Sequence, residues 1–398
     1  MFFRTLFGLL LAAFFATTAS ARIGTIDQAP AATLLFPHFE VDTANDQGVS
    51  TVLTIQNSSA TAILASVTLW TDFGVPTLHF DMYLTGYDQQ TLDLADTFRR
   101  RFLPVTASAG QDPTDTISNK GPFSQDINFA SCNQLLPEPQ GSLTDASLVQ
   151  AHTGRASVEY LGGLCGGRNY GDNIARGYVT VDTINNCTTR KPGQAGYFIN
   201  GGGGDATNQN VLLGDYVILD RARGRFLAES AAHIEASFTL SSGTTFYGRL
   251  IGNSAADNRE PLPTAWAARY ASARTEVDYW RDPGVVVAPF TCGTTPAPFA
   301  LPQRHVSVFN DAGGLVSNPT GNLFPNAMGT TAGAGALGLS QPLGWLFANL
   351  NASPGVIRQS WMTFRQMPRG AASSSPLGYS VPGIQLGNAA TGADPVIP

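Results

Sequence analysis

The sequence predicts an all-β protein, folded as an antiparallel β-sandwich of broadly immunoglobulin-like type. Charged residues make up only 13% of the 398 residues, and 42 residues are glycine. This composition is usual for exported all-β proteins, whose many turns consume small and polar residues. Hydrophobic and polar residues also alternate along several short, closely spaced segments, which is the pattern of half-buried strands. The length allows one large sandwich or two sandwiches packed together.

Residues 22–94 are expected to form the first strands of the sandwich, with the clearest alternation from residue 49 onward. Strands are predicted there at 49–56, 63–69, 78–84 and 90–94. Clusters of Asn, Ser, Asp, Gly and Pro between these segments indicate turns. In the third segment, the alternation places Thr77, His79 and Asp81 on the outward-facing side.

Residues 95–172 break the alternation and predict an insertion of loops and short helices. Residues 95–102 can form one or two helical turns, and Ser142 or Thr144 can cap a helix that runs through Val149. The stretch between them is rich in Pro, Gly, Asp and Ser, which indicates a long ordered loop.

Residues 173–369 return to strand-like patterns and are expected to pack as a β-rich region on the first strands. Strands are predicted at 175–183, 215–219, 233–240, 244–251, 275–281, 284–290, 304–309 and 356–365. Residues 370–398, which are dominated by small residues and proline, are expected to form a loose C-terminal tail.

Residues 1–21 have the three parts of a secretory signal peptide. Arg4 precedes the apolar run Leu6–Phe15, and an Ala-Ser-Ala sequence ending at residue 21 supplies the small residues that a signal peptidase reads. We therefore expect an exported protein, periplasmic or extracellular. No second apolar run of membrane length follows, so no membrane span is expected in the mature protein.

Four cysteines lie in the mature part of the chain, and an even number in an exported protein indicates two disulfides. They are Cys132, Cys165, Cys187 and Cys292. None of them has C-x-x-C spacing, which argues against a thioredoxin-like redox site and a zinc site. Three pairings are possible. We favour Cys132–Cys165 with Cys187–Cys292.

Catalytic motifs are scarce: neither G-x-S-x-G nor H-E-x-x-H occurs, and the five histidines stand singly. Two pairs of residues remain as catalytic candidates. His233 and Glu235 share the polar face of one predicted strand, and Glu276 and Asp278 share that of another, beside Trp280. Paired carboxylates near an aromatic side chain can serve glycoside hydrolysis. Any exposed acidic strand presents the same pattern.

One loop, residues 42–48, offers several oxygen atoms to calcium. The candidate ligands are Asp42, Asn45 and Asp46. The loop does not match the D-x-[DN]-x-[DN]-G pattern, and a hairpin connection uses the same residue types. Calcium is the one cofactor that the sequence suggests. Of the five tryptophans, at least three are expected to be buried, whereas an exposed one could stack on a sugar ring.

Several blocks of the sequence resemble an uncharacterised family of secreted bacterial β-rich proteins. They are VTLWTDFGVPTLHFDMYLTGYDQQTLDL (67–94), GYVTVDTINNC (177–187), NQNVLLGDYVIL (208–219), HIEA (233–236) and PLGWLFANLN (342–351). The resemblance implies one integrated unit rather than a string of modules. It implies no activity and transfers no site residues.

These observations favour a non-catalytic secreted protein, structural or binding, that acts in the periplasm or at the cell surface. Its expected partner is a polysaccharide or another envelope protein, because a net charge of −6 argues against nucleic acid. Two alternatives remain: a polysaccharide-active hydrolase on a sandwich scaffold, and a subunit of a surface filament or layer. The first requires a groove with two carboxylates, and the second an open sheet edge.

Overall fold

The computed structural model describes most of the chain after residue 28. The described residues are 29–108, 123–125, 127–132, 135–138, 146–222, 225–237, 244–252, 256–270, 275–333, 335–353, 358–366, 379–382 and 384–388. The signal peptide predicted at residues 1–21 lies outside them. None of the helices in these ranges is long and apolar enough to cross a membrane.

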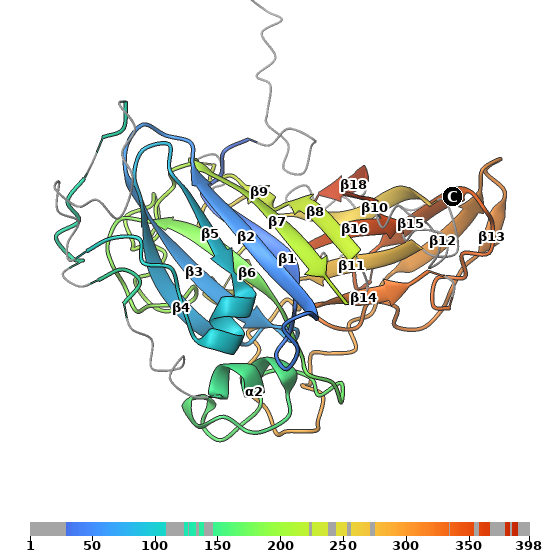
Figure 1. Ribbon diagram of the computed structural model, residues 1–398. Coiled ribbons are helices and arrows are strands. Elements are labelled where there is room, and N and C mark those ends of the chain that lie inside the picture. The colour runs from blue at the N-terminus through green and yellow to red at the C-terminus, as the bar shows by residue number, and fades with distance from the viewer. Residues whose placement is uncertain are drawn as a thin grey trace, which may run out of the picture.

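Two antiparallel sheets form a sandwich in the N-terminal half, which confirms the predicted all-β class (Figure 1). One has the order β4-β3-β6-β1-β9, built from β1 (Thr33–Asp42), β3 (Ile63–Thr71), β4 (Pro76–Leu84), β6 (Ile174–Ile184) and β9 (Ala232–Ile234). The other has the order β5-β2-β7-β8, built from β2 (Val49–Asn57), β5 (Gln89–Asp93), β7 (Leu212–Asp220) and β8 (Arg225–Ser230). Their facing side chains, among them Phe36, Leu53 and Val67, form one hydrophobic core. The finer immunoglobulin-like assignment stays a prediction.

Two further antiparallel sheets make up the C-terminal half. The first has the order β13-β12-β15-β10-β18, built from β10 (Pro263–Tyr270), β12 (His305–Asn310), β13 (Leu315–Ser317), β15 (Gly344–Asn349) and β18 (Ile384–Asn388). The second has the order β14-β11-β16-β17, built from β11 (Thr275–Arg281), β14 (Met328–Ala332), β16 (Ser360–Gln366) and β17 (Tyr379–Pro382). The prediction of a loose tail is therefore wrong for β17 and β18, because their backbones pair with β16 and β10.

The sheet β4-β3-β6-β1-β9, hereafter the central sheet, is covered on both faces. Phe36 and Val67 face the first core, whereas Leu35 and Leu64 belong to a second core shared with the C-terminal sheets. All nine residues of β3 are buried as a result. Strands buried on both faces lose the alternation of inward hydrophobic and outward polar residues.

Strand β1 cannot be recognised from an alternation of hydrophobic and polar residues. Nearly all of its residues are buried, and Pro37 interrupts it. Proline has no N–H to donate, and the pairing with β6 shifts register between Phe36 and Phe39 to accommodate it. The sequence therefore gave no alternation here, although β1 lies beside β6 in the middle of the fold.

Helical structure is short and lies mostly in the predicted insertion. The segments are the π-helix Asp96–Arg100, α2 (Ser147–Thr153), the 3₁₀-helix Glu159–Leu161 and α3 (Gly248–Ile251). Helix α2 begins after Ala146, and the predicted caps Ser142 and Thr144 lie outside the described residues.

Three strand predictions fail. Residues 244–251 include helix α3 and join no sheet, and the backbone amide of Tyr247 donates a hydrogen bond to the Asp257 carboxylate instead of to a neighbouring strand. Residues 284–290 form no strand and make a single bridge, from Phe290 to Cys165. The strand predicted at 233–240 is reduced in the described residues to β9, which ends at Ile234.

The polar face of β4, predicted to face outward, is buried. Thr77, His79 and Asp81 are 3%, 5% and 6% exposed, because His152 of α2 covers Thr77 and residues of the loop after β6, among them Thr188 and Tyr197, cover Asp81 and His79. A local alternation cannot reveal a layer that arrives from distant parts of the chain. This covered polar face carries the candidate site described below.

The central sheet is tied to its covering segments by a buried carboxylate, that of Asp182 on β6. Its Oδ2 accepts hydrogen bonds from the hydroxyls of Tyr197 and Tyr247, at 2.8 and 2.9 Å. Thr33 of β1 donates to Oδ1, and the Arg259 guanidinium lies 3.8 Å from the same oxygen. The partners come from β1, from the loop after β6 and from the segment that leads into β10, so this one buried carboxylate holds these three parts of the chain to β6.

A buried guanidinium has a similar role in the C-terminal half. Arg281 is 1% exposed and donates hydrogen bonds of 2.7–3.0 Å to four backbone carbonyls. The acceptors are Leu301, Pro302, Phe324 and Leu350. Burial lowers the pKa of Arg281 to about 10. Because these acceptors belong to three segments, near residues 301, 324 and 350, the side chain holds those segments to the end of β11.

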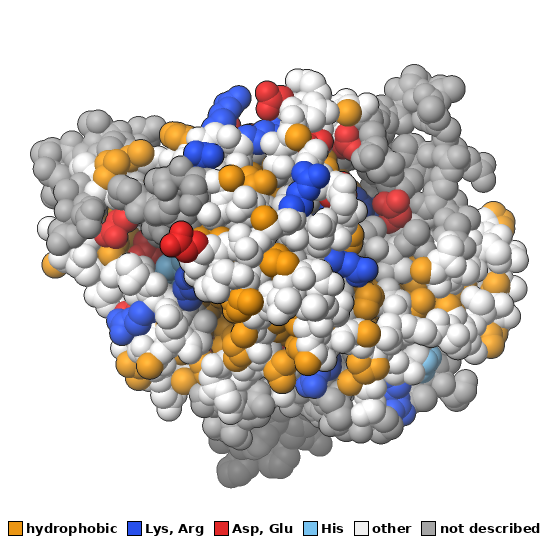
Figure 2. All heavy atoms as spheres, turned by 90° about the horizontal axis from the view of Figure 1, so that it is seen from below, with side chains coloured by type: hydrophobic (Ala, Val, Ile, Leu, Met, Phe, Trp, Pro, Cys, Tyr) orange, Lys and Arg blue, Asp and Glu red, His pale blue; other side chains and the backbone are white. Residues whose placement is uncertain are grey.

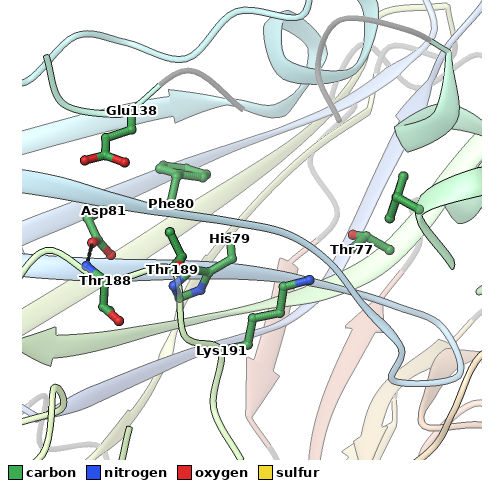
Figure 3. Close-up of a pocket in the computed structure, with 9 residues that line it drawn as sticks. Thr77, His79, Phe80, Asp81, Glu138, Thr188, Thr189 and Lys191 are labelled. Carbon is green, nitrogen blue, oxygen red and sulfur yellow. Dashed lines mark hydrogen bonds between the residues drawn. The ribbon is translucent and has the colours of Figure 1, made fainter. Parts of the chain in front are cut away.

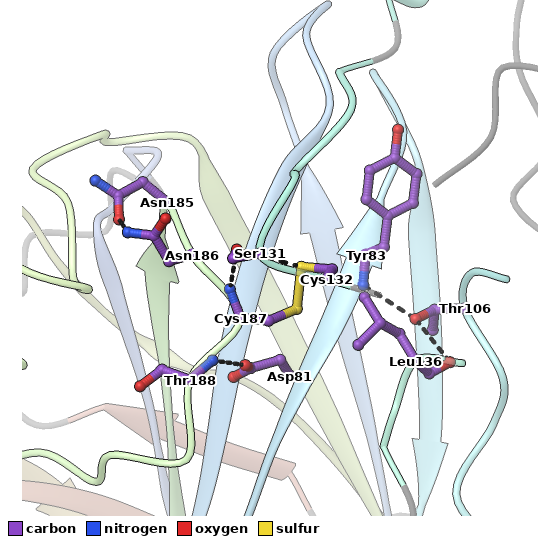
Figure 4. The surroundings of a disulfide bond; sticks show 10 residues. All are labelled: Asp81, Tyr83, Thr106, Ser131, Cys132, Leu136, Asn185, Asn186, Cys187 and Thr188. Atoms are coloured by element: carbon purple, nitrogen blue, oxygen red, sulfur yellow. Dashed lines mark hydrogen bonds between the residues drawn. A yellow bond between two sulfur atoms is a disulfide. The ribbon is translucent and has the colours of Figure 1, made fainter. Parts of the chain in front are cut away.

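Both disulfide pairings predicted from the sequence are wrong. Cys132 is bonded to Cys187, and Cys165 to Cys292. The second pair meets because Cys165 and Phe290 exchange two backbone hydrogen bonds, which brings residue 292 within reach. The first pair joins the insertion to the loop that follows β6 (Figure 4). Proximity along the chain was therefore a poor guide to proximity in space.

Replacement of Asp182 tests the importance of the buried charge. We expect Asp182→Ala to lower the free energy of unfolding by about 3–5 kcal/mol, because Arg259 is left buried without a carboxylate. Asp311→Ala, at an exposed ion pair with Arg269, is the matched control and should cost about 0–1 kcal/mol. Urea denaturation followed by tryptophan fluorescence gives both values. Equal effects of the two substitutions would contradict this role for Asp182.

The disulfides can be tested separately. Their half-cystines are 55 and 127 residues apart in sequence, and the chain-entropy model gives each bridge about 4–5 kcal/mol. Replacing both members of one pair by Ser should lower the denaturation midpoint while the other bridge persists. Peptide mapping without reduction should recover Cys132 with Cys187 and Cys165 with Cys292. Recovery of Cys132 with Cys165 would refute the connectivity.

Candidate binding site

The acidic pair Glu276 and Asp278 lies on β11, but the structure does not leave it open to a substrate. Asp278 is 4% exposed, so its predicted outward position is wrong. The Arg365 guanidinium on β16 lies 2.6 Å from Asp278 and 3.5 Å from Glu276. Nearby, burial raises the pKa of Glu229 to about 8. The negative charges of Glu276 and Asp278 therefore balance the charge of the buried Arg365 guanidinium between β11 and β16.

His233 and Glu235 lie at the other edge strand of the central sheet and are not brought near the first pair. The ring of His233 contacts the backbone of Gly214 on β7, with Nε2 3.1 Å from the amide nitrogen. Burial lowers the pKa of His233 and raises that of Glu235. These contacts join β9 to the neighbouring sheet, which is a structural use of the histidine.

The proposed calcium ligands are engaged within their own loop. Asp42 Oδ1 accepts hydrogen bonds from the amides of Ala44 and Asn45, and Asn45 Oδ1 accepts one from Gln47. The Arg99 guanidinium, at 3.6 Å, is the cation beside Asp46. Among the described residues, no three His, Cys, Asp or Glu side chains are grouped to hold a metal ion.

Four of the five tryptophans are buried, which confirms the prediction of at least three. They are Trp70, Trp266, Trp280 and Trp361. Trp345 is half-buried, and the Arg269 guanidinium lies 5.0 Å from its ring centre. The cation thus shares the aromatic surface that stacking on a sugar would use.

A polar pocket lies on the covered face of β4, at the place predicted to face solvent (Figure 3). Its cavity volume is about 200 Å³. The side chains that shape it are His79, Asp81, Glu138, Tyr160, Thr188 and Lys191. A shallower hollow of about 330 Å³, bordered by Cys187 and Arg190, shares Glu138 and Thr188 with it. Together they form a concave polar surface along the edge of the central sheet.

Asp81 lies at one end of the pocket, where its Oδ2 accepts a 2.6 Å hydrogen bond from the amide of Thr188. Its Oδ1 is buried without a hydrogen-bond partner of good geometry among the described residues. Burial raises the pKa of Asp81 to about 7, although hydrogen bonding from Thr188 and Ser66 lowers it. Near neutral pH this carboxyl can therefore either accept or donate a hydrogen bond.

The ring of His79 is neutral and fully engaged. Its Nδ1 lies 2.9 Å from the hydroxyl of Thr68, and its Nε2 lies 3.2 Å from that of Ser66. Burial lowers the pKa of His79 to about 4. With both nitrogens hydrogen-bonded to β3, the ring forms a fixed wall of the pocket and has no free lone pair for a metal or a proton transfer.

The opposite wall is a loop, residues 187–191, that is fastened at several points. Cys187 is bonded to Cys132, and its amide donates to the hydroxyl of Ser131 (Figure 4). Asp205 accepts two hydrogen bonds from Arg190, at 2.6 and 2.7 Å, and one from Thr188 at 2.7 Å. The pocket is therefore preorganised, which reduces the entropy lost when a ligand binds.

Lys191 crosses the middle of this pocket. Figure 3 shows its stem beside His79 and its Nζ directed towards Thr77. The side chain is half-buried, and burial lowers its pKa. Lys191 is not recognisable as a site residue from the sequence, because a lone lysine in a polar loop has no distinguishing pattern.

Charge elsewhere is dispersed. On the face seen in Figure 2, Lys and Arg side chains lie singly among polar and apolar ones. Arg221, which precedes β8, is one of the exposed arginines of the described chain.

Titration of Asp81 should be visible in the stability of the protein. The folded state binds this proton more tightly than the unfolded chain, so the free energy of unfolding should fall as pH rises from about 3.8 to about 7. We expect Asp81→Asn to remove about 2–4 kcal/mol of this fall. Urea denaturation of both proteins between pH 4 and about pH 8 measures it. Parallel pH profiles would contradict the assignment.

Comparison with known proteins gives no family. No family model matches the chain, and no curated protein matches it either. One solved structure, a lectin from Pleurotus ostreatus in complex with GalNAc, aligns with 91% of this chain and 85% of its own. The alignment has 9% sequence identity and a TM-score of 0.15, too low to support an argument about fold or ligand.

Proposed function

We propose that the protein is an exported, non-catalytic binding protein that holds a saccharide unit in the pocket beside β4. The observation that carries this proposal is the preorganised polar pocket, with donors and acceptors fixed around a cavity of about 200 Å³. Drug-sized ligands occupy about 300–1,000 Å³, so the pocket suits one small unit of a larger molecule. The adjoining hollow leaves room for a neighbouring unit.

The chemistry of the lining favours hydroxyl groups over a purely ionic or apolar ligand. Lys191 donates hydrogen bonds, the carboxylate of Glu138 accepts them, and the hydroxyl of Thr189 does both. A sugar hydroxyl also does both, so it can pair with any of these groups. Tyr160, 39% exposed at the rim, offers an aromatic face. Such amphipathic surfaces suit the mixed polar and apolar faces of a sugar ring.

The electrostatics support binding rather than hydrolysis. The pocket histidine is neutral, and both of its nitrogens are occupied by β3 hydroxyls. The acidic pair on β11 is engaged by Arg365. These two arrangements supply neither the acid nor the base that glycoside hydrolysis requires, and the pocket carboxyls Asp81 and Glu138 are the groups through which the hydrolase alternative would act.

Export is supported by the two disulfides, which persist in oxidising compartments. One of them fastens the loop that forms a pocket wall, so the proposed site depends on that environment. An exported protein would meet its partner in the periplasm or outside the cell. Of the partners expected there, the chemistry of the pocket favours a polysaccharide.

Tyr160 provides the most direct test. We expect wild-type protein to bind a monosaccharide from a panel of hexoses, hexuronic acids and N-acetylhexosamines in titration calorimetry. Tyr160→Ala should weaken that binding about tenfold, through loss of the aromatic contact. Phe226→Ala is the matched control, since Phe226 is an exposed aromatic residue on β8, outside the pocket.

Cosedimentation with insoluble polysaccharides extends the test to polymers. Saturable binding that Tyr160→Ala weakens and Phe226→Ala preserves would support the proposal. Absence of binding to every sugar, or equal loss in both variants, would contradict it.

A further inference from the structure

Lysine is rare in this chain, which makes its position in the pocket informative. Of 23 lysine and arginine residues, only Lys120 and Lys191 are lysines. A guanidinium stays protonated under all ordinary conditions, whereas a lysine amine can lose its proton and act as a nucleophile. The one described lysine lies in the polar pocket beside β4.

Arg190, the residue before Lys191, has a different role from Lys191. Arg190 forms a bidentate ion pair with Asp205 at 2.6 and 2.7 Å and serves to fasten the loop. Lys191 has no carboxylate within ion-pair distance among the described residues, and its backbone exchanges two hydrogen bonds with Gln194, one with the side-chain oxygen and one with the backbone amide. Its side chain is therefore not needed to hold the loop.

The surroundings of the Lys191 side chain make its amine easier to deprotonate than that of an exposed lysine. The neutral ring of His79 lies along its stem, and Thr77 lies ahead of Nζ (Figure 3). Partial burial removes water from the ammonium ion and so lowers its pKa. Asp81 and Glu138, the acidic groups of the pocket, line its other end.

We propose that Lys191 captures its ligand covalently and reversibly, as an imine with a small hydroxylated aldehyde or ketone such as the open-chain form of a reducing sugar. This inference rests on the proposed function, because it assigns the ligand class of the same pocket. The observation that carries it is a half-buried lysine amine in the polar pocket, beside the neutral ring of His79 and with no carboxylate of the described residues within ion-pair distance.

The step needs no co-reactant. The neutral Nζ attacks the carbonyl carbon, a C–N bond forms, and the carbonyl oxygen takes up a proton to give a carbinolamine. The carbinolamine hydroxyl then leaves as water with a second proton, and the nitrogen keeps a double bond to carbon. The amine nitrogen gives up two protons in all, and the departing oxygen takes up two, so the protons balance as water is released. Nothing is oxidised or reduced, and hydrolysis releases the ligand unchanged.

The test uses the intact wild-type protein, with its second lysine as internal standard. Protein is incubated with glyceraldehyde and sodium cyanoborohydride, which reduces an imine to a stable secondary amine. Proteolysis and mass spectrometry then give the adduct at Lys191, at Lys120 and at the N-terminal amine. We expect about fivefold or more adduct at Lys191 relative to Lys120 at low aldehyde concentration. Equal or lower labelling of Lys191 would overturn the inference.

Two further arms separate this inference from the proposed function. Lys191→Arg keeps the positive charge and removes the nucleophile, so it should lose the adduct while its unfolding curve stays close to that of wild type. A methyl glycoside, which cannot open to an aldehyde, should bind more weakly than the free sugar. If the glycoside and the free sugar bind equally and no adduct forms, the imine is refuted and the binding pocket stands. If neither binds, the proposed function fails as well.

Discussion

The buried carboxylate of Asp182 holds together parts of the chain that no local interaction connects. It lies in β6 of the central sheet, accepts hydrogen bonds from Tyr197 and Tyr247, and faces Arg259. These partners belong to the loop after β6 and to the segment that leads into β10. A charge is tolerated in such a place only when hydrogen bonds and an opposite charge replace its lost hydration. The contact between the two halves of the molecule is therefore specific as well as hydrophobic.

The pocket is a consequence of the same arrangement. Tyr197 is anchored by Asp182, so the loop that contains it is held over the central sheet and brings Lys191 above the polar face of β4. The Cys132–Cys187 disulfide fastens the start of that loop to the insertion. A rigid sheet, a buried charge and a covalent bond thus fix a polar cavity at a sheet edge. Such preorganisation is what a binding site requires, and it explains why polar residues are buried there.

Most of the candidate site could not be read from the sequence. His79 and Asp81 were recognised as the polar side of a strand, but nothing nearby in the chain indicated what would cover them. The segments that do so begin about 40 to 105 residues further along the chain. Conversely, Glu276 and Asp278 satisfied a local catalytic pattern, and their partner Arg365 lies on a strand that pairs with theirs only in the folded protein. The spacing of acidic residues in the sequence cannot by itself distinguish a catalytic pair of carboxylates from a pair that balances a buried cation.

The sequence by itself determined the β class and the strands that have one face on a core, such as β2 and β5, because a period of two is a local property of the backbone. Only the tertiary structure decided the position of β1, the pairing of the four cysteines and the burial of the polar face of β4. A strand covered on both faces loses its alternation, and a disulfide follows distance in space. Both depend on contacts between residues that are far apart in the chain, which no local pattern encodes.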